Sequence, residues 1–379
     1  MAEKPKVEIR IVIPCYNEPE VMQVIRSLWD CERGDFAVEI MVIVNSYRLS
    51  PESIRSLNRK SYNELIDFAE SRNTSDFYLS ALLVEDIPGH QTGAGLPRKI
   101  GMDEAVERFK KEGNLSGIIV SLDADCTVAA NYLTEIYRCF KQYRLKSATI
   151  EFHHPVEHLD EENEIRRAGE VYEEYLRYYR SALEYANYPY AYYTIGSAFA
   201  VTVKTYLQAG GMGKQQAGED FYFLQKVFPL GKTQFIANTC VYPASRVSDR
   251  VPFGTGPAIS KMIETKQIQK LSYQVAAFTE LKMLFAKIDL FFKQPLEKIE
   301  EELCDLPAYL QTFLREDNFL PKIEEINAHS ASSAAFRKRF FNYFTAFKIL
   351  KYLNFVHPHP YEFSDVKKQY PILKQLLPP

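Results

Sequence analysis

Two short runs of β-branched residues near the start of the chain constrain its fold more than any other feature. Val7–Pro14 reads VEIRIVIP and Val38–Val44 reads VEIMVIV, and both runs favour buried strands. Pro14 should end the first strand because proline cannot donate to a ladder, and Asn45-Ser46 should end the second. Between them lies a helical pattern with one apolar face, formed by Val21, Val24, Ile25 and Leu28. This order of strand, helix and strand predicts a mostly parallel α/β sheet flanked by helices.

The same alternation continues along the first third of the chain. Phe77–Val84 predicts a third strand, and residues 86–99 then form a loop rich in glycine and proline. A helix is expected from about Gly101 to Lys111, followed by a strand over Gly117–Leu122. That strand stops at Asp123-Ala124-Asp125. Acidic residues therefore lie at the carboxyl end of a strand, where ligands bind in open α/β sheets.

Composition excludes several classes of protein. The 379 residues carry 46 Lys and Arg against 49 Asp and Glu, a net charge of −3, so no nucleic-acid partner is expected. The six cysteines form no CxxC pair, which argues against a zinc ribbon or a disulfide scaffold. The amino terminus has no apolar signal segment, and no apolar stretch reaches the length of a membrane span. A cytoplasmic protein is the expectation.

The second half of the sequence changes character near residue 257. Before it, Gly196–Val203 and Thr233–Val241 predict strands, and Gly218-Glu219-Asp220 opens a helix that runs to Phe228. After it, the pattern is wholly helical, which predicts a main domain over 1–257 and an all-helical carboxyl-terminal region over 258–379. The aromatic and basic stretch Phe336–Phe355 favours a helix packed on the main domain, with peripheral contact to the inner face of a membrane as the alternative.

The sequence Asp123-Ala124-Asp125 carries the clearest chemical signal. Two carboxylates at i and i+2 reach one crevice only if the backbone has left the alternation of a strand. Hard oxygen ligands of this kind suit Mg²⁺ or Mn²⁺ shared with phosphate groups. In an isolated D-x-D, a solvated acidic turn is the simpler interpretation.

A set of motifs in a fixed order supports a functional interpretation. The motifs are Ile13–Glu18 (IPCYNE), the loop with Arg98, Asp123-Ala124-Asp125, Gly196-Ser197, Gly210-Gly211-Met212 and Gly218-Glu219-Asp220. Over residues 8–255 this set resembles the family 2 type glycosyltransferases with the GT-A fold, a Rossmann-like architecture. The resemblance implies transfer of a sugar from a nucleotide diphosphate-sugar to an acceptor hydroxyl, with inversion at the anomeric carbon. It also implies a requirement for Mn²⁺ or Mg²⁺.

The resemblance also implies roles for individual residues. The nucleotide site would be lined by Pro14, Tyr16, Asn17 and Glu18, with Arg98 near the base or the diphosphate. Asp123 would lie near the ribose or the metal, and Asp125 would be the firmest metal ligand. Two alternatives stay open: Asn17 and Glu18 could begin a helix, with Asn17 as its cap, and Arg98 could be a surface cation.

For the chemical step, the resemblance assigns the catalytic base to Asp220 or, failing that, Glu219. A carboxylate near the acceptor hydroxyl can take its proton during attack. The alternative is that both acids only favour the amino terminus of a helix after Gly218. Downstream, Arg246 and Arg250 lie in a hydroxyl-rich loop that would close over the diphosphate.

The donor and the acceptor are less constrained. At the end of the second strand, relatives carry an Asp that reads the nucleobase, whereas this chain has Asn45. UDP and GDP donors therefore both stay open, and the acceptor is a carbohydrate or a lipid-linked molecule of unknown identity. Two other functions were considered: a non-catalytic nucleotide-sugar-binding protein and a sugar nucleotidyltransferase. The second ranks lower because no glycine-rich basic loop follows the first strand.

Overall fold

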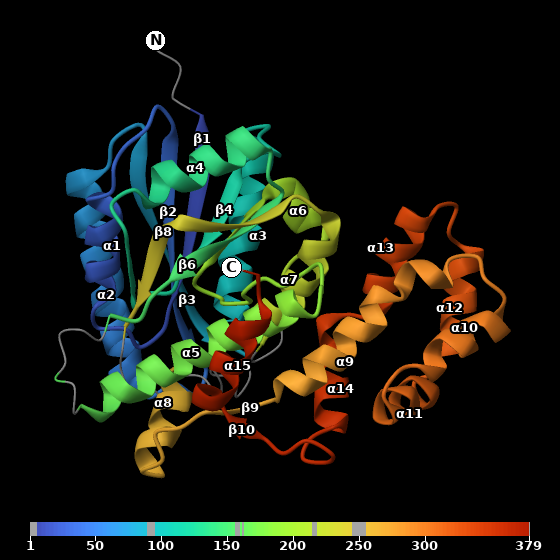
Figure 1. Cartoon of the computed structure of the whole chain (residues 1–379). Coiled ribbons are helices and arrows are strands. Elements are labelled where there is room, and N and C mark those ends of the chain that lie inside the picture. The colour runs from blue at the N-terminus through green and yellow to red at the C-terminus, as the bar shows by residue number, and fades with distance from the viewer. Residues whose placement is uncertain are drawn as a thin grey trace. The chain divides into compact units, whose positions relative to one another are not determined.

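The computed structural model describes residues 6–88, 95–155, 160, 163–213, 218–244 and 255–378. The chain divides into two compact units (Figure 1). The first comprises Met1–Gly169 and Thr194–Lys266, and the second comprises Glu170–Tyr193 and Gln267–Pro379. The domain boundary expected between residues 257 and 258 stays a prediction. In the part of the chain that the structure describes, no helix is long and apolar enough to span a membrane.

An eight-stranded sheet forms the centre of the first unit, in the order β3-β2-β1-β4-β7-β6-β8-β5. Its strands are β1 (Val7–Cys15), β2 (Ala37–Tyr47), β3 (Phe77–Ile87), β4 (Ile118–Ser121), β5 (Cys126–Val128), β6 (Ser147–Phe152), β7 (Phe199–Thr202) and β8 (Thr233–Pro243). Strands β3, β2, β1 and β4 run parallel, as do β6 and β8. Strand β7 is antiparallel to both its neighbours, and β5 to β8. The predicted α/β class with a mostly parallel sheet is confirmed.

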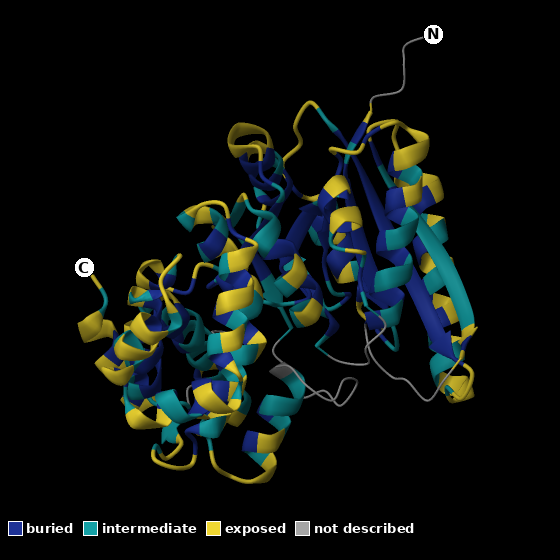
Figure 2. Ribbon diagram, turned by 90° about the vertical axis from the view of Figure 1, so that its right-hand side faces the viewer, coloured by how far each residue is buried: buried dark blue, intermediate teal, exposed yellow. Residues whose placement is uncertain are grey.

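Helices flank this sheet, and the buried residues concentrate in the strands (Figure 2). The helices of the first unit are α1 (Val21–Trp29), α2 (Glu52–Arg72), α3 (Gly95–Lys111), α4 (Tyr132–Tyr143), α6 (Val203–Gln208), α7 (Glu219–Val227), the 3-10 helix η1 (Phe228–Leu230) and α8 (Thr255–Glu264). Helix α5 (Glu164–Tyr185) begins in the first unit and continues into the second. The apolar face predicted for α1 is confirmed, since all four of its residues are buried.

Two strands run further than the sequence indicates. Strand β1 continues through Pro14 to Cys15, with Pro14 paired in register with Ile43. The backbone carbonyl of Val12 faces β4, where it accepts from the N–H of Leu122 just past the end of that strand. Pro14 lies two residues further and its nitrogen faces the same side. Pairing with β4 has already ended there, so the missing N–H costs no ladder hydrogen bond. Strand β2 likewise continues past Asn45 and Ser46 to Tyr47, which leaves both polar side chains inside a strand.

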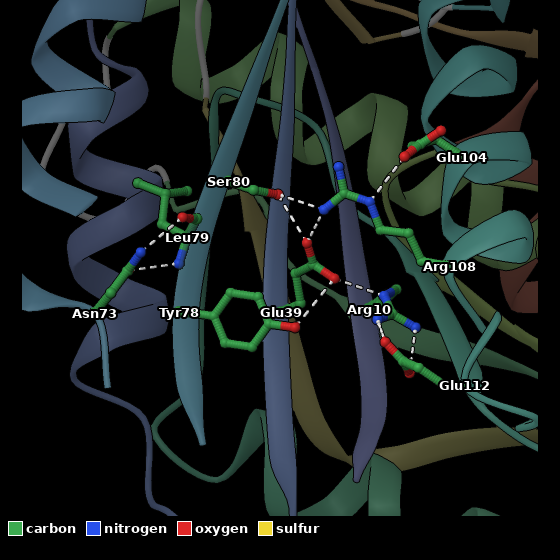
Figure 3. A network of polar contacts seen from close by, with 9 residues as sticks. All are labelled: Arg10, Glu39, Asn73, Tyr78, Leu79, Ser80, Glu104, Arg108 and Glu112. Atoms are coloured by element: carbon green, nitrogen blue, oxygen red, sulfur yellow. Dashed lines mark hydrogen bonds and ion pairs between the residues drawn. The ribbon is translucent and has the colours of Figure 1, made fainter. Parts of the chain in front are cut away.

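A buried network of charged side chains crosses the first half of the parallel strands (Figure 3). Arg10 on β1 and Glu39 on β2 are register partners, 1% and 0% exposed, and Arg10 Nε lies 2.6 Å from Glu39 Oε2. Arg108 on α3 also pairs with Glu39, and Glu112 pairs with Arg10. Ser80 donates to Glu39 Oε1 over 2.9 Å. Every charge that this network buries therefore has a partner of opposite sign, as burial in a low dielectric requires.

The second unit is helical, apart from a two-stranded ribbon of β9 (Leu271–Ser272) and β10 (Ser364–Asp365) that the sequence did not indicate. Its remaining elements are α9 (Val275–Ala286), η2 (Ile288–Phe291), α10 (Leu296–Cys304), α11 (Ala308–Glu316), α12 (Phe319–Ala328), α13 (Ser333–Tyr343), α14 (Ala346–Phe355) and α15 (Val366–Leu376). With strands this short, the ribbon contributes little, and helix packing supplies the core.

The aromatic stretch singled out in the sequence forms part of that core. It is divided into α13 and α14, because Thr345 caps α14 by accepting from the backbone N–H of Lys348. The rings of Phe336, Phe340, Phe341 and Phe344 are all buried. Phe341 lies against Phe285 with ring centroids 5.2 Å apart. These rings pack inside the second unit, and membrane contact through the carboxyl-terminal helices stays a prediction.

Candidate active site

The acidic motif follows β4 at the carboxyl edge of the parallel strands. After Ser121 the backbone leaves the strand, passes through a turn at Ala124 and Asp125, and enters β5 at Cys126. Ala124 is buried, whereas the side chains of Asp123 and Asp125 are both partly exposed. The departure from strand alternation that two cooperating carboxylates need is therefore present at this position.

Arg98 joins this motif to a distant part of the chain. Its guanidinium lies 2.6 Å from Asp123 Oδ1 through Nη2, and Nη1 donates to Glu219 Oε1. Arg98 is only 2% exposed. The sequence placed it in a loop before a helix starting near Gly101, but α3 already begins at Gly95, so Arg98 lies in its first turn. The alternative of a surface cation is therefore wrong, because the guanidinium is buried between two carboxylates.

Gly196 makes room for this arrangement. A Cβ atom at Gly196 would lie 2.8 Å from Arg98 Nη2, closer than side chains pack. The hydroxyl of Ser121, at the end of β4, donates to the backbone carbonyl of Gly196 over 2.6 Å and fixes this segment. The glycine of the predicted Gly196-Ser197 motif thus has a steric reason: it lets the backbone approach the guanidinium.

Glu219 and Asp220 begin α7, directly after Gly218, whose φ of 69° is in the left-handed region. Glu219 is buried, and Asp220 is partly buried. Asp220 Oδ1 accepts from the backbone N–H of Phe221 over 2.7 Å. Both acids also lie in the first turn, where the helix dipole favours negative charge, so the structural alternative considered for this pair is compatible with a chemical role.

The environment separates the two acids electrostatically. Burial, followed by the charge of Glu219, raises the pKa of Asp220 to about 6, although Arg98 and the Phe221 N–H oppose the shift. Burial lowers the pKa of Arg98, but the carboxylates of Asp123, Glu219 and Asp220 raise it by more than burial lowers it. The net shift is upward. A carboxyl with a pKa of about 6 can exchange a proton near neutral pH, which makes Asp220 a candidate for acid–base chemistry.

The residues predicted to line a nucleotide site surround the ends of β1 and β2. Pro14 is buried in β1, and the hydroxyl of Tyr16 lies 3.5 Å from Ser50 Oγ. Asn17 does not cap α1, contrary to the alternative considered, because the residue preceding that helix is Glu20 and a turn separates the two. Glu18 is 1% exposed and its Oε1 accepts from the Glu20 N–H over 3.1 Å.

Asn58, on α2, is a residue of this region that the sequence did not reveal. Its Oδ1 accepts from the backbone N–H of Asn17 over 3.0 Å, and its Nδ2 donates to the backbone carbonyl of Asn45 over 2.7 Å. Asn58 is 2% exposed and thereby ties the end of β1 to β2. Its position on a buried face with Ser61, Leu65 and Ala69 was the available signal, but the polar residues on that face hid the helical periodicity.

The side chain of Asn45 is buried without being satisfied. It is 0% exposed, and within the described residues neither its Oδ1 nor its Nδ2 has a hydrogen-bond partner. The hydroxyl of the adjacent Ser46 is in the same state. Because buried polar atoms nearly always have partners, an amide left with none requires an explanation.

The donor set around Asp123 and Asp125 suits a hard divalent cation. Among the described residues, no three His, Cys, Asp or Glu side chains are placed to hold a metal ion together. Mg²⁺, however, is commonly bound by one or two carboxylates with substrate phosphates and water completing its shell. Two partly exposed carboxylates fit that pattern. The predicted residues Arg246 and Arg250 lie outside the described residues.

Solved structures similar to this chain contain nucleotide sugars. S. aureus TarS 1-349 in complex with UDP-GlcNAc is 12% identical, with a TM-score of 0.44 over 85% of this chain and 92% of that one. The mannosyltransferase PcManGT from Pyrobaculum calidifontis, in complex with GDP-Man and Mn²⁺, is 13% identical, with a TM-score of 0.40 over 93% of this chain and 86% of that one. No protein-family model matches the sequence. No curated protein matches it either.

Proposed function

We propose that this protein is a divalent-metal-dependent glycosyltransferase that moves a sugar from a nucleotide diphosphate-sugar to an acceptor hydroxyl. The observation that carries the proposal is the meeting of Asp123, Glu219 and Asp220 around the buried Arg98 at the carboxyl edge of the strands. These residues come from three motifs that are far apart in the sequence. Ligand chemistry in open α/β sheets is concentrated at this edge.

Asp220 is the proposed catalytic base. As the acceptor oxygen bonds to the anomeric carbon, its proton passes to the Asp220 carboxylate, and the bond from that carbon to the diphosphate breaks with its electron pair leaving on the phosphate oxygen. This single displacement inverts the anomeric centre. Glu219 is less suited to the role because its carboxylate is bound to Arg98 and buried. A pKa of about 6 keeps most of Asp220 ionised at neutral pH while leaving it basic enough to accept a proton.

Asp123 and Asp125 are the proposed ligands of Mg²⁺ or Mn²⁺. The cation would stabilise the negative charge that grows on the departing diphosphate. Around it, Pro14, Tyr16, Asn17 and Glu18 would contact the nucleotide, which carries uracil or guanine. Arg246 and Arg250 keep their proposed role beside the diphosphate.

The assignment of the metal ligands can be tested by donor-dependent stabilisation. We expect a UDP- or GDP-sugar with Mn²⁺ or Mg²⁺ to stabilise the protein by about 2.7 kcal/mol when the donor is present at about 100 times its dissociation constant. Asp125→Asn should lose this stabilisation because the cation loses a charged ligand. The measurement is thermal unfolding with and without each donor and each metal.

A surface acid provides the control for this test. Asp289→Asn changes an exposed aspartate that pairs with Arg337 and accepts from the hydroxyl of Ser333, and it should keep the full response to donor and metal. Product release must then be followed with candidate acceptors, because binding alone would also be shown by a non-catalytic protein. Stabilisation of Asp125→Asn equal to that of the wild type would rule out this metal site.

Asn45 is proposed to read the donor base with its unsatisfied amide. Asn45→Leu should raise the free energy of unfolding of the ligand-free protein by about 1–3 kcal/mol, because a buried polar group without partners is removed. The same change should weaken donor binding by about tenfold or more, since the base would face an apolar side chain. Denaturant unfolding and donor titration measure the two effects.

Asn58→Leu is the matched control for Asn45→Leu. It also replaces a buried asparagine with leucine, but both the Oδ1 and the Nδ2 of Asn58 are hydrogen-bonded. Asn58→Leu should therefore lower the free energy of unfolding. If Asn45→Leu destabilised the ligand-free protein as Asn58→Leu does, the amide of Asn45 would have a structural role and the assignment to the donor base would be wrong.

A further inference from the structure

The guanidinium of Arg98 connects three elements that are distant in the sequence. It projects from the first turn of α3 and binds Asp123, 25 residues further on, and Glu219, 121 residues further on. The contact with Glu219 is buried, and there charge-assisted hydrogen bonds are strong and geometrically restrictive, whereas the side chain of Asp123 is 35% exposed.

We propose that Arg98 is a positioning residue, which fixes the carboxylates of Asp123 and Glu219 relative to each other and leaves Asp220 as the carboxylate available to the acceptor proton. The link between the three side chains is a property of the fold. Its role in sugar transfer rests on the proposed function.

The packing around Arg98 supports a requirement for arginine at this position. A planar guanidinium can hold two carboxylates at once through separate nitrogens, whereas a lysine ammonium is a point charge without that fork. Gly196 provides the space for the guanidinium, and Ser121 holds the Gly196 carbonyl in place. Arg98 Nε is buried without a hydrogen-bond partner among the described residues, so the fold keeps the arginine despite an unsatisfied donor.

The charges around Asp220 provide a readout that a loss of stability alone would not produce. Among the described residues, Glu219, Arg98 and Asp123 are the charged groups with the largest effect on its carboxylate. Arg98 lowers the pKa of Asp220, whereas Glu219 raises it. If the two side chains hold the arrangement described, removing each charge should move the titration of Asp220 in opposite directions.

Carbon-13 NMR of the full-length, ligand-free protein with labelled aspartate carboxyls measures this titration, with Asp220→Asn identifying the resonance. We expect Arg98→Gln to raise the midpoint by about 1 pH unit or more and Glu219→Gln to lower it, with Arg98→Lys between Arg98→Gln and the wild type. In donor turnover, Arg98→Gln should lower kcat by about 100-fold, because the catalytic groups are displaced rather than removed.

Arg108→Gln is the matched control. It also removes a cation from a buried carboxylate, Glu39, in the network of Figure 3, so it should lower the melting temperature without moving the Asp220 titration. If Arg98→Gln does not fold, Arg98→Lys and Glu219→Gln still test the link. The proposal is overturned if both leave the midpoint unchanged, or if Arg98→Gln folds and keeps its kcat. If the two variants shift the midpoint in opposite directions but the wild-type protein transfers no sugar, the link between Arg98, Glu219 and Asp220 stands and the proposed function is rejected.

Discussion

Replacing Asp220 by asparagine should lower kcat by about 1,000-fold while donor binding stays close to that of the wild type. The carboxamide has nearly the same shape but cannot take the acceptor proton, and general bases contribute roughly 10² to 10⁴ in rate. Neither the donor nor the metal depends on Asp220 in the proposed site, so binding should persist. Steady-state transfer, with a donor that stabilises the protein in the unfolding test, measures the effect on kcat. Calorimetric titration of the same donor measures the effect on binding.

The pH dependence provides a second test of the same residue. Asp220 acts as a base only when ionised, and its pKa is raised to about 6, so kcat/KM of the wild type should fall about tenfold per pH unit below 6 and level off above it. Stability should show the opposite trend. Because the folded-state pKa exceeds the unfolded value, the contribution of Asp220 to stability is full below about pH 4 and is lost as the pH rises through 6.

Asp220→Asn should therefore melt at a higher temperature than the wild type at pH 7, since it removes a carboxylate whose ionisation the fold disfavours. Glu219→Gln is the comparison variant for both measurements. Its amide oxygen can still accept from Arg98, but the negative charge is removed. Asp220→Asn with more than a tenth of wild-type kcat would move the catalytic base to another residue.

The parts of the fold that follow from local periodicity were predictable. Strands β1 and β2 show as β-branched runs and α1 as an apolar face, because each pattern depends only on neighbouring residues. The position of Asp123 and Asp125 at a strand end followed from the same reasoning. The grouping of motifs at one edge depended on parallel pairing, which the alternation of strands and helices implied.

The roles that depend on tertiary contacts could not be predicted. The sequence indicates a loop at Arg98 because glycines and prolines precede it. Its burial depends on a contact with Glu219, which is distant in the sequence. Asn58 lies on a helix whose buried face is partly polar, so no periodic signal marked it. The unsatisfied amide of Asn45 is defined by what surrounds it in space, which a linear pattern does not contain.

The Arg10–Glu39 pair illustrates the same limit for stability. A charged residue within a β-branched run is visible in both strands, but the pairing requires the register that sets Arg10 opposite Glu39. An error of one residue in register would put the two side chains on opposite faces of the sheet. The two charged residues that interrupt the apolar runs therefore form one ion pair. Substitutions in this pair should be among those that lower the stability of the first unit most.

Glu39→Ala should lower the free energy of unfolding by about 3–5 kcal/mol, because removing one partner of a buried pair leaves the other charge uncompensated. Glu39 is 0% exposed and also accepts from Arg108, Ser80 and Tyr78, so the variant disconnects four donors at once. Within the described residues, Glu112 would be the only ion-pair partner left to Arg10, and its side chain is 35% exposed. Urea unfolding of the wild type and the variant at the same pH measures the loss.

The double variant Arg10→Met/Glu39→Ala distinguishes an uncompensated charge from a simple loss of packing. Replacing both members of a buried pair with apolar side chains is often neutral, so the double variant should recover most of the stability lost in Glu39→Ala. Arg108 and Glu112 are both partly exposed and can turn to water. If the double variant were as unstable as Glu39→Ala, the cost would come from the cavity rather than from the buried arginine. A loss below about 1 kcal/mol in Glu39→Ala would contradict both explanations, since a buried carboxylate with four donors would then contribute no more than an exposed ion pair.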